Sequence, residues 1–188
     1  MKNPNEAAYE EYTQLIHHRF IEHEEEIKND MAKTIKDAVS QAILKSEDAF
    51  SSEKKGAASF IIFSFLYSSF LLKEYIMRLD IFDEDFYLDA SACESDINYS
   101  VLGKIFEKAV LDVADKIEKD GCFLGKNQKY NLRWKYVDVL KEQLRNLILS
   151  ILDSEEIYLI IKRMDRVSPL TVMVGDFQDD QIPYIQLL

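Results

Sequence analysis

The scarcity of helix-breaking residues most constrains how this chain can fold. Its 188 residues include only five glycines and three prolines, and the stretch from 5 to 50 contains neither. Sheet-rich proteins need turn residues roughly every eight to twelve positions, and this sequence does not supply them. A chain of this kind is expected to form a few long helices, and its length suits one domain with a substantial core.

The spacing of apolar residues predicts where those helices lie. Apolar side chains recur in steps of three and four between 5 and 50, which predicts one long helix or two helices that meet near Asn29 and Asp30. Further helices are expected over 53–79, 97–120, 132–153 and from about 155, with Gly121 as a C-terminal cap. The segment after Pro169 is short and β-branched, and is expected to be extended, either lying on the bundle or as a small pair of strands.

These expectations combine into one fold prediction. The chain is predicted to be a single all-α domain over 1–188, a bundle of five to six helices with a short extended or irregular C-terminal segment. The most apolar stretch, 57–72, has only 16 residues, whereas a membrane span needs about 20. We therefore expect it to lie inside the central helix of the bundle and not in a membrane.

The N-terminal segment and the cysteines predict a cytoplasmic location. The N-terminus has no apolar segment of the kind found in a secretory signal. Cys93 and Cys122 are the only cysteines, which is too few for a disulfide framework. A reducing compartment is the expected setting.

The net charge of −11 is concentrated in one part of the chain. Residues 81–120 carry 11 acidic and four basic side chains. This balance disfavours nucleic acids and anionic membranes, whose binding depends on basic side chains. It suits a protein partner with a basic surface. The predicted partner-binding residues are Asp83, Glu84, Asp85, Asp89, Glu94 and Asp96.

A cluster of histidines and glutamates is the basis of an alternative hypothesis. On one helix His18, Glu22 and Glu25 would share a face, and this mixture of nitrogen and oxygen ligands suits zinc or iron. The structural interpretation, a solvated charged face with one histidine at the edge of the core, is favoured because one helix rarely supplies all the ligands of a metal ion. The recognised helical metal motifs are incomplete, because no Glu-x-x-His occurs and Ile27 stands where H-E-x-x-H needs its second histidine.

Two further segments each have a functional and a structural interpretation. Residues 126–136 contain four bases and three aromatic rings, the ingredients of single-stranded nucleic-acid binding, but the overall negative charge favours a basic loop leading into a helix. Aromatic residues at helical spacing could line a cavity for a small apolar ligand, although core packing is the usual role of such a stripe. The stripe consists of Phe60, Phe63, Tyr67 and Phe70.

The leading functional prediction is a non-catalytic interaction protein, such as an adaptor, an inhibitor or an immunity-type antagonist. The alternatives are a helical metal-binding protein or metalloenzyme that uses the histidine and glutamate cluster at 17–26, and a binder of a small apolar ligand. No catalytic residue is predicted, and neither a cofactor nor an oligomeric state follows from the residues.

Overall fold

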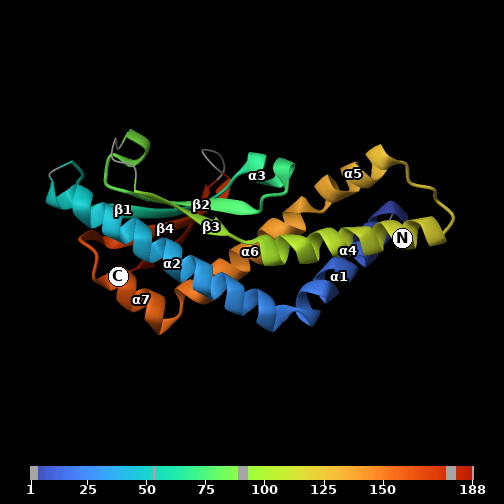
Figure 1. Cartoon of the computed structure of the whole chain (residues 1–188), viewed down its shortest axis with the longest axis horizontal. Helices are drawn as coiled ribbons and strands as arrows, with labels where there is room; N and C mark the ends of the chain where they lie inside the picture. Colours follow the sequence, from blue (N-terminus) through green and yellow to red (C-terminus); the bar gives the residue numbers. More distant parts are fainter. Residues whose placement is uncertain (1–3, 53, 89–92, 177–180, 188) are drawn as a thin grey trace. The chain divides into compact units, whose positions relative to one another are not determined.

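The structure is a computed structural model that describes residues 4–52, 54–88, 93–176 and 181–187 (Figure 1). It divides into two compact units. Unit 1 comprises Met1–Asp30 and Ser100–Asn146, and unit 2 comprises Met31–Tyr99 and Leu147–Leu188. The division falls within two helices, α2 (Glu24–Ser51) and α6 (Val137–Leu152).

Unit 1 is helical in the part that the structure describes. It contains α1 (Pro4–Glu22), the start of α2, α4 (Ser100–Lys119), α5 (Lys126–Lys135) and most of α6. The predicted helix over 97–120 is confirmed as α4, and Gly121 follows it with a positive φ of 94° that glycine adopts at a helix C-terminus. The helix predicted over 132–153 is instead two helices separated at Tyr136.

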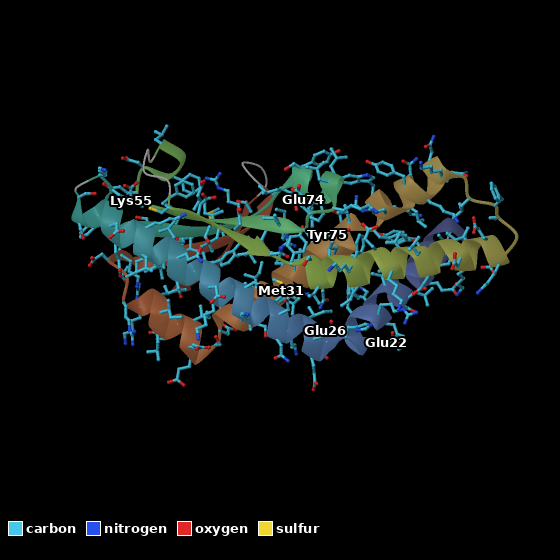
Figure 2. The ribbon with its side chains drawn as sticks, in the orientation of Figure 1. Glu22, Glu26, Met31, Lys55, Glu74 and Tyr75 are labelled. Atoms are coloured by element: carbon cyan, nitrogen blue, oxygen red, sulfur yellow. The ribbon has the colours of Figure 1, made fainter. Side chains whose placement is uncertain are left out.

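The N-terminal helical region is also divided, but earlier than the sequence predicted. The break falls at His23, between α1 and α2, and not near Asn29 and Asp30. Glu22 and Glu26, labelled in Figure 2, lie on either side of it.

The core of unit 1 is formed by the apolar faces that the spacing predicted. Ile16 and Phe20 of α1 and Phe106 of α4 are all buried. Tyr136 is also fully buried and stacks on Tyr9 with 5.3 Å between ring centroids. Its hydroxyl has no hydrogen-bond partner among the described residues, and burial raises the pKa of Tyr136 to about 12.

Unit 2 contains a mixed sheet. Besides most of α2 and the end of α6, unit 2 contains β1 (Ala58–Phe65), α3 (Tyr67–Leu72), β2 (Ile76–Phe82), a 3-10 turn η1 (Phe86–Leu88), β3 (Glu94–Asn98), α7 (Glu155–Lys162), β4 (Arg166–Asp176) and β5 (Gln181–Leu187). Across the described residues the strand order is β3-β2-β1-β4-β5. Strand β1 runs parallel to β4, and the other neighbours are antiparallel.

The prediction of an all-α helical bundle is therefore wrong, and the protein has an α/β fold. The expected central helix over 53–79 is replaced by β1, α3 and β2. Ile61, Ile62 and Phe63 are consecutive in β1 and all have no exposed surface. A central strand buried on both faces has a continuous apolar sequence, and periodicity alone cannot distinguish it from a buried helix.

Two predictions for the C-terminal part are confirmed. The segment after Ser154 is a helix, α7, and the Ser154 side chain accepts a hydrogen bond from Ile157 N at its start. The segment around Pro169 is extended and forms β4, which is followed by β5. However, β4 joins the sheet directly beside β1, so it belongs to the core of unit 2 and does not lie on a helical bundle.

The two faces of the sheet differ in character. On one face, Ser95 of β3 donates a hydrogen bond to Gln41 of α2 at 3.3 Å, and α2 in turn pairs with α7 through Lys36 and Glu156. The opposite face carries polar side chains, including Arg78 and Asp80. Figure 1 shows α2 and α7 on one side of the sheet and α3 and η1 on the other.

Candidate functional site

The predicted partner-binding carboxylates fall into two groups on unit 2. Glu84 and Asp85 are exposed in the turn after β2, and Glu94 and Asp96 are exposed on β3. Asp89 lies outside the described residues. We call the four exposed residues, Glu84, Asp85, Glu94 and Asp96, the acidic edge.

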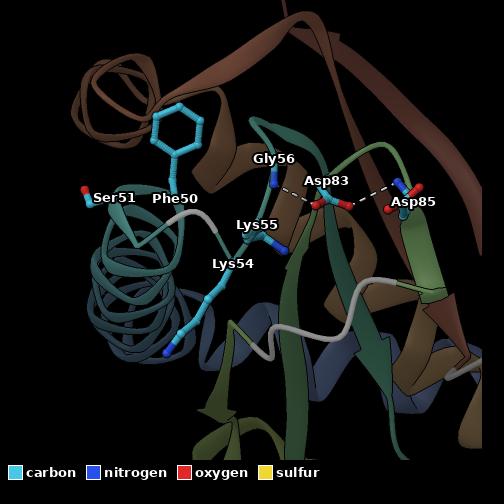
Figure 3. Close-up of a pocket in the computed structure, with 7 residues that line it drawn as sticks. All are labelled: Phe50, Ser51, Lys54, Lys55, Gly56, Asp83 and Asp85. Atoms are coloured by element: carbon cyan, nitrogen blue, oxygen red, sulfur yellow. Dashed lines mark hydrogen bonds between the residues drawn. The ribbon is translucent and has the colours of Figure 1, made fainter.

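Asp83, the remaining predicted residue, is buried and only 6% exposed. Its Oδ2 accepts a hydrogen bond from Gly56 N at 2.8 Å, and its Oδ1 accepts one from Asp85 N at 3.0 Å (Figure 3). A Cβ added at Gly56 would lie 3.3 Å from Asp83 Cβ, so the close approach favours glycine there. Asp83 thus joins the segment before β1 to the end of β2, and its carboxylate is directed at backbone groups of its own chain.

Strand β3 is an edge strand of the sheet, and the backbone N–H and C=O groups of every second residue point away from β2. Ile81 N donates to Cys93 O at 3.3 Å, which makes positions 93, 95 and 97 the ones that bond to β2. The backbone groups of Glu94 and Asp96 therefore point outward, and Lys45 of α2 donates to Glu94 O. Charged side chains on such a strand protect it from pairing with other strands.

A group of charged side chains connects β2 to β3 on the polar face of the sheet. Arg78 Nε donates to both oxygens of Asp80, at 2.8 and 2.9 Å, and its Nη2 pairs with Glu94. Asp80 is only 2% exposed. Burial raises the pKa of Asp80, and the hydrogen bonds and positive charge of Arg78 oppose that rise. Arg78 is therefore the counter-charge of a buried carboxylate.

A pocket of about 650 Å³ lies where α2 ends and the chain enters β1 (Figure 3). It is lined by Phe50, Ser51, Lys54, Lys55, Gly56, Asp83 and Asp85. Lys55 is only 6% exposed, and its Nζ lies 5.9 Å from the centroid of the Phe82 ring. Burial lowers the pKa of Lys55, while the nearby Cys93 and Asp83 act in the opposite direction. No pattern in the sequence indicated that this lysine is buried.

Replacing Lys55 with methionine should stabilise unit 2 by about 1 kcal/mol at pH 7, because the variant keeps the apolar stem and removes a buried charge. The pKa of Lys55 is lower in the folded state, so the unfolded chain binds the proton more tightly. The wild type should therefore gain stability relative to the variant as the pH rises towards about 10.4, the ordinary lysine value. Urea unfolding at several pH values measures the free energy of unfolding of both proteins. A stability advantage of the variant that grows with pH would contradict the prediction.

The structure brings together only part of the predicted metal site. His18 Nε2 lies 3.3 Å from Glu22 Oε1, with 70% and 40% of the two side chains exposed. Glu22 also accepts a hydrogen bond from Arg19 at 2.7 Å, which lowers the pKa of Glu22. Glu25 belongs to α2, beyond the break at His23. Within the described ranges no three side chains of metal-binding type form a group.

The basic segment over 126–136 forms α5 and the residue after it. Two of its bases are paired within unit 1, because Lys129 Nζ lies 3.0 Å from Glu118 Oε1 and the buried Arg133 pairs with Glu107. These pairs leave fewer bases available for phosphate groups than the sequence alone suggested.

The aromatic stripe does not form a helical face. Phe60 and Phe63 belong to β1, where an odd spacing places them on opposite faces of the sheet. Phe63 is fully buried, whereas Tyr67 of α3 is 70% exposed. The stripe that suggested an apolar ligand cavity is therefore divided between two elements and two environments.

Comparison of the chain with models of protein families, with curated proteins and with solved structures finds no match. Among the described residues, no helix combines the length and apolar character that crossing a membrane would require.

Proposed function

We propose that the protein is a non-catalytic interaction protein, an adaptor, inhibitor or immunity-type antagonist, that docks a basic protein partner through the acidic edge. The observation that carries the proposal is the exposure of carboxylates at the end strand β3 and at the turn after β2. Arg78 compensates Glu94 there, but Glu84, Asp85 and Asp96 remain exposed acidic side chains.

The exposed carboxylates are expected to act mainly on how fast and how selectively a partner binds. Exposed carboxylates attract a basic partner over about 8 Å at physiological ionic strength and raise the association rate more than the final affinity. The net charge of −11 adds to this attraction and opposes binding to other acidic surfaces.

We propose a cytoplasmic location together with this function. Both Cys93 and Cys122 are free thiols, and Cys122 is exposed. Free exposed thiols are typical of reducing compartments, where disulfides rarely persist.

Charge reversal of the acidic edge tests the proposal. The probe is a fluorescently labelled lysine-rich peptide, and its affinity is measured by anisotropy over a range of salt concentrations. We expect the double variant Glu84→Lys/Asp96→Lys to bind the peptide about tenfold more weakly, which corresponds to about 1.4 kcal/mol. We also expect the dependence of affinity on salt to become less steep.

The matched control is Asp115→Lys/Glu142→Lys, which changes the net charge equally at two exposed carboxylates of unit 1. It should retain most of the affinity. An equal loss in both double variants would show that only the overall charge matters, and binding that is insensitive to salt would also refute the proposal.

A further inference from the structure

Helix α3 exposes large apolar side chains on unit 2. Tyr67 is 70% exposed, Leu72 63% and Leu71 47%, whereas Ser69 and Phe70 of the same helix are buried. Single exposed apolar residues are common on protein surfaces, but a contiguous group of large ones marks an interaction site more often.

The turn after α3 holds this group in a fixed conformation. Lys73 and Tyr75 both have positive φ values, 60° and 54°, which residues other than glycine rarely adopt. Ser69 supports the turn through two bonds, because its Oγ accepts from Ile76 N at 2.6 Å and its backbone oxygen accepts from Glu74 N at 3.1 Å. Figure 2 marks Glu74 and Tyr75 beside α3.

Tyr75 anchors the turn to the core of unit 2. It is only 3% exposed, its ring lies 5.7 Å from the ring of Tyr99, and its backbone oxygen accepts from Tyr99 N at 2.8 Å. A backbone conformation that costs free energy persists because these contacts stabilise it. The exposed side chains of α3 thus precede a turn that is anchored in the core of unit 2.

The acidic edge begins next to this helix. Strand β2 starts at Ile76, directly after the turn, and Ile76 is paired with Asn98 of β3. Asp96 is paired with Arg78, only two positions further along β2. Helix α3 lies on the side of the sheet opposite α2 (Figure 1), the side to which Arg78 and Asp96 also belong. The exposed apolar side chains of α3 and the exposed carboxylate of Asp96 therefore belong to the same side of the sheet.

We propose that the partner contacts α3 with an amphipathic basic segment. Its apolar side chains pack on Tyr67, Leu71 and Leu72, and its lysines or arginines meet the acidic edge at Asp96. This proposal rests on the proposed function and adds a chemical class for the partner. The exposed carboxylate of Asp96 favours a basic occupant, because an acidic segment would place a like charge against it and a purely apolar segment would leave it without a counter-charge.

Two labelled peptides separate the apolar from the electrostatic contribution. The first is an amphipathic helical peptide of leucine and lysine, and the second has the same lysines with every leucine replaced by serine. We expect Leu71→Ser/Leu72→Ser to weaken binding of the leucine–lysine peptide about tenfold. Its affinity for the serine–lysine peptide and the salt dependence of both peptides should not change.

The matched control is Leu44→Ser/Leu111→Ser, which removes two leucines that are 62% and 57% exposed on other helices. It should bind both peptides as the wild type does. Circular dichroism checks that the variants remain folded, which is expected because none of the four side chains is buried.

The outcomes distinguish this inference from the function on which it rests. Unchanged binding of the leucine–lysine peptide by Leu71→Ser/Leu72→Ser overturns the inference, even if Glu84→Lys/Asp96→Lys still weakens both peptides. An equal loss in the leucine control overturns it as well. Failure of the wild type to bind either peptide overturns the inference and the proposed function together.

Discussion

Replacing Arg78 with methionine should destabilise unit 2 by about 3 kcal/mol, because it leaves the buried carboxylate of Asp80 without its counter-charge. Arg78 donates two hydrogen bonds to Asp80, and the Asp80 side chain has almost no contact with water. The Arg78 side chain is 32% exposed, so we place the loss at the lower end of the range for buried ion pairs. Urea unfolding measures the change in free energy.

A double variant that also replaces Asp80 tests whether the unpaired carboxylate causes the loss of stability. Arg78→Met/Asp80→Asn should recover much of the lost stability, because a neutral amide costs less to bury than a carboxylate. Burial already raises the pKa of Asp80, so the folded state binds a proton at this carboxylate more readily than the unfolded chain does. The destabilisation by Arg78→Met should therefore decrease as the pH is lowered through the pKa of Asp80. A loss that is independent of pH and unchanged in the double variant would contradict the argument.

Replacing Phe63 with alanine should cost about 4 kcal/mol, whereas Tyr67→Ala should change stability by less than about 0.5 kcal/mol. Phe63 is fully buried in the central strand β1, and its loss creates a cavity between the sheet and the layer that covers it. Tyr67 is 70% exposed, so its removal takes little apolar surface out of the core. Thermal or urea unfolding of both variants measures the two values.

This comparison also tests the architecture. A helix over 53–79 would place Phe63 and Tyr67 on the same face, four residues apart, and alanine at either position would then have similar costs. Losses of similar size at the two positions would therefore argue against β1 and for the helix that the sequence predicted.

Some elements could be predicted because their stability depends on a local pattern. Helix α4 has one apolar face and one polar face, and Gly121 follows it, so both its periodicity and its end were visible in the residues. Helix α7 was predicted in the same way from Ser154 and the apolar residues that follow it. The break at His23 was not predicted, because no glycine or proline marks it.

The sheet could not be predicted with the same reasoning. Strand β1 is covered on both faces and has strands on both sides, so its residues are apolar without alternation. The strongest indication that it was a strand was its content of phenylalanine and isoleucine, which are common in strands. That indication was weaker than the scarcity of glycine and proline, which favoured helices.

The candidate sites show the same limit at the level of single residues. Asp83 and Glu84 are adjacent acidic residues that the sequence could not distinguish, yet Asp83 is buried and Glu84 is exposed. The difference comes from Gly56, a residue distant in the chain, whose amide donates to Asp83. The burial of Lys55 and the position of Asp80 beside Arg78 likewise depend on contacts within unit 2.

The sequence by itself determined the amphipathic helices, the extended C-terminal segment, the negative charge and its concentration over 81–120. These properties follow from composition and local spacing, which act within a few turns of the chain. Tertiary structure alone decided that the most apolar segment is a strand, and which carboxylates face solvent. Both depend on pairing and burial against residues far away in the chain, whose identity no local pattern records.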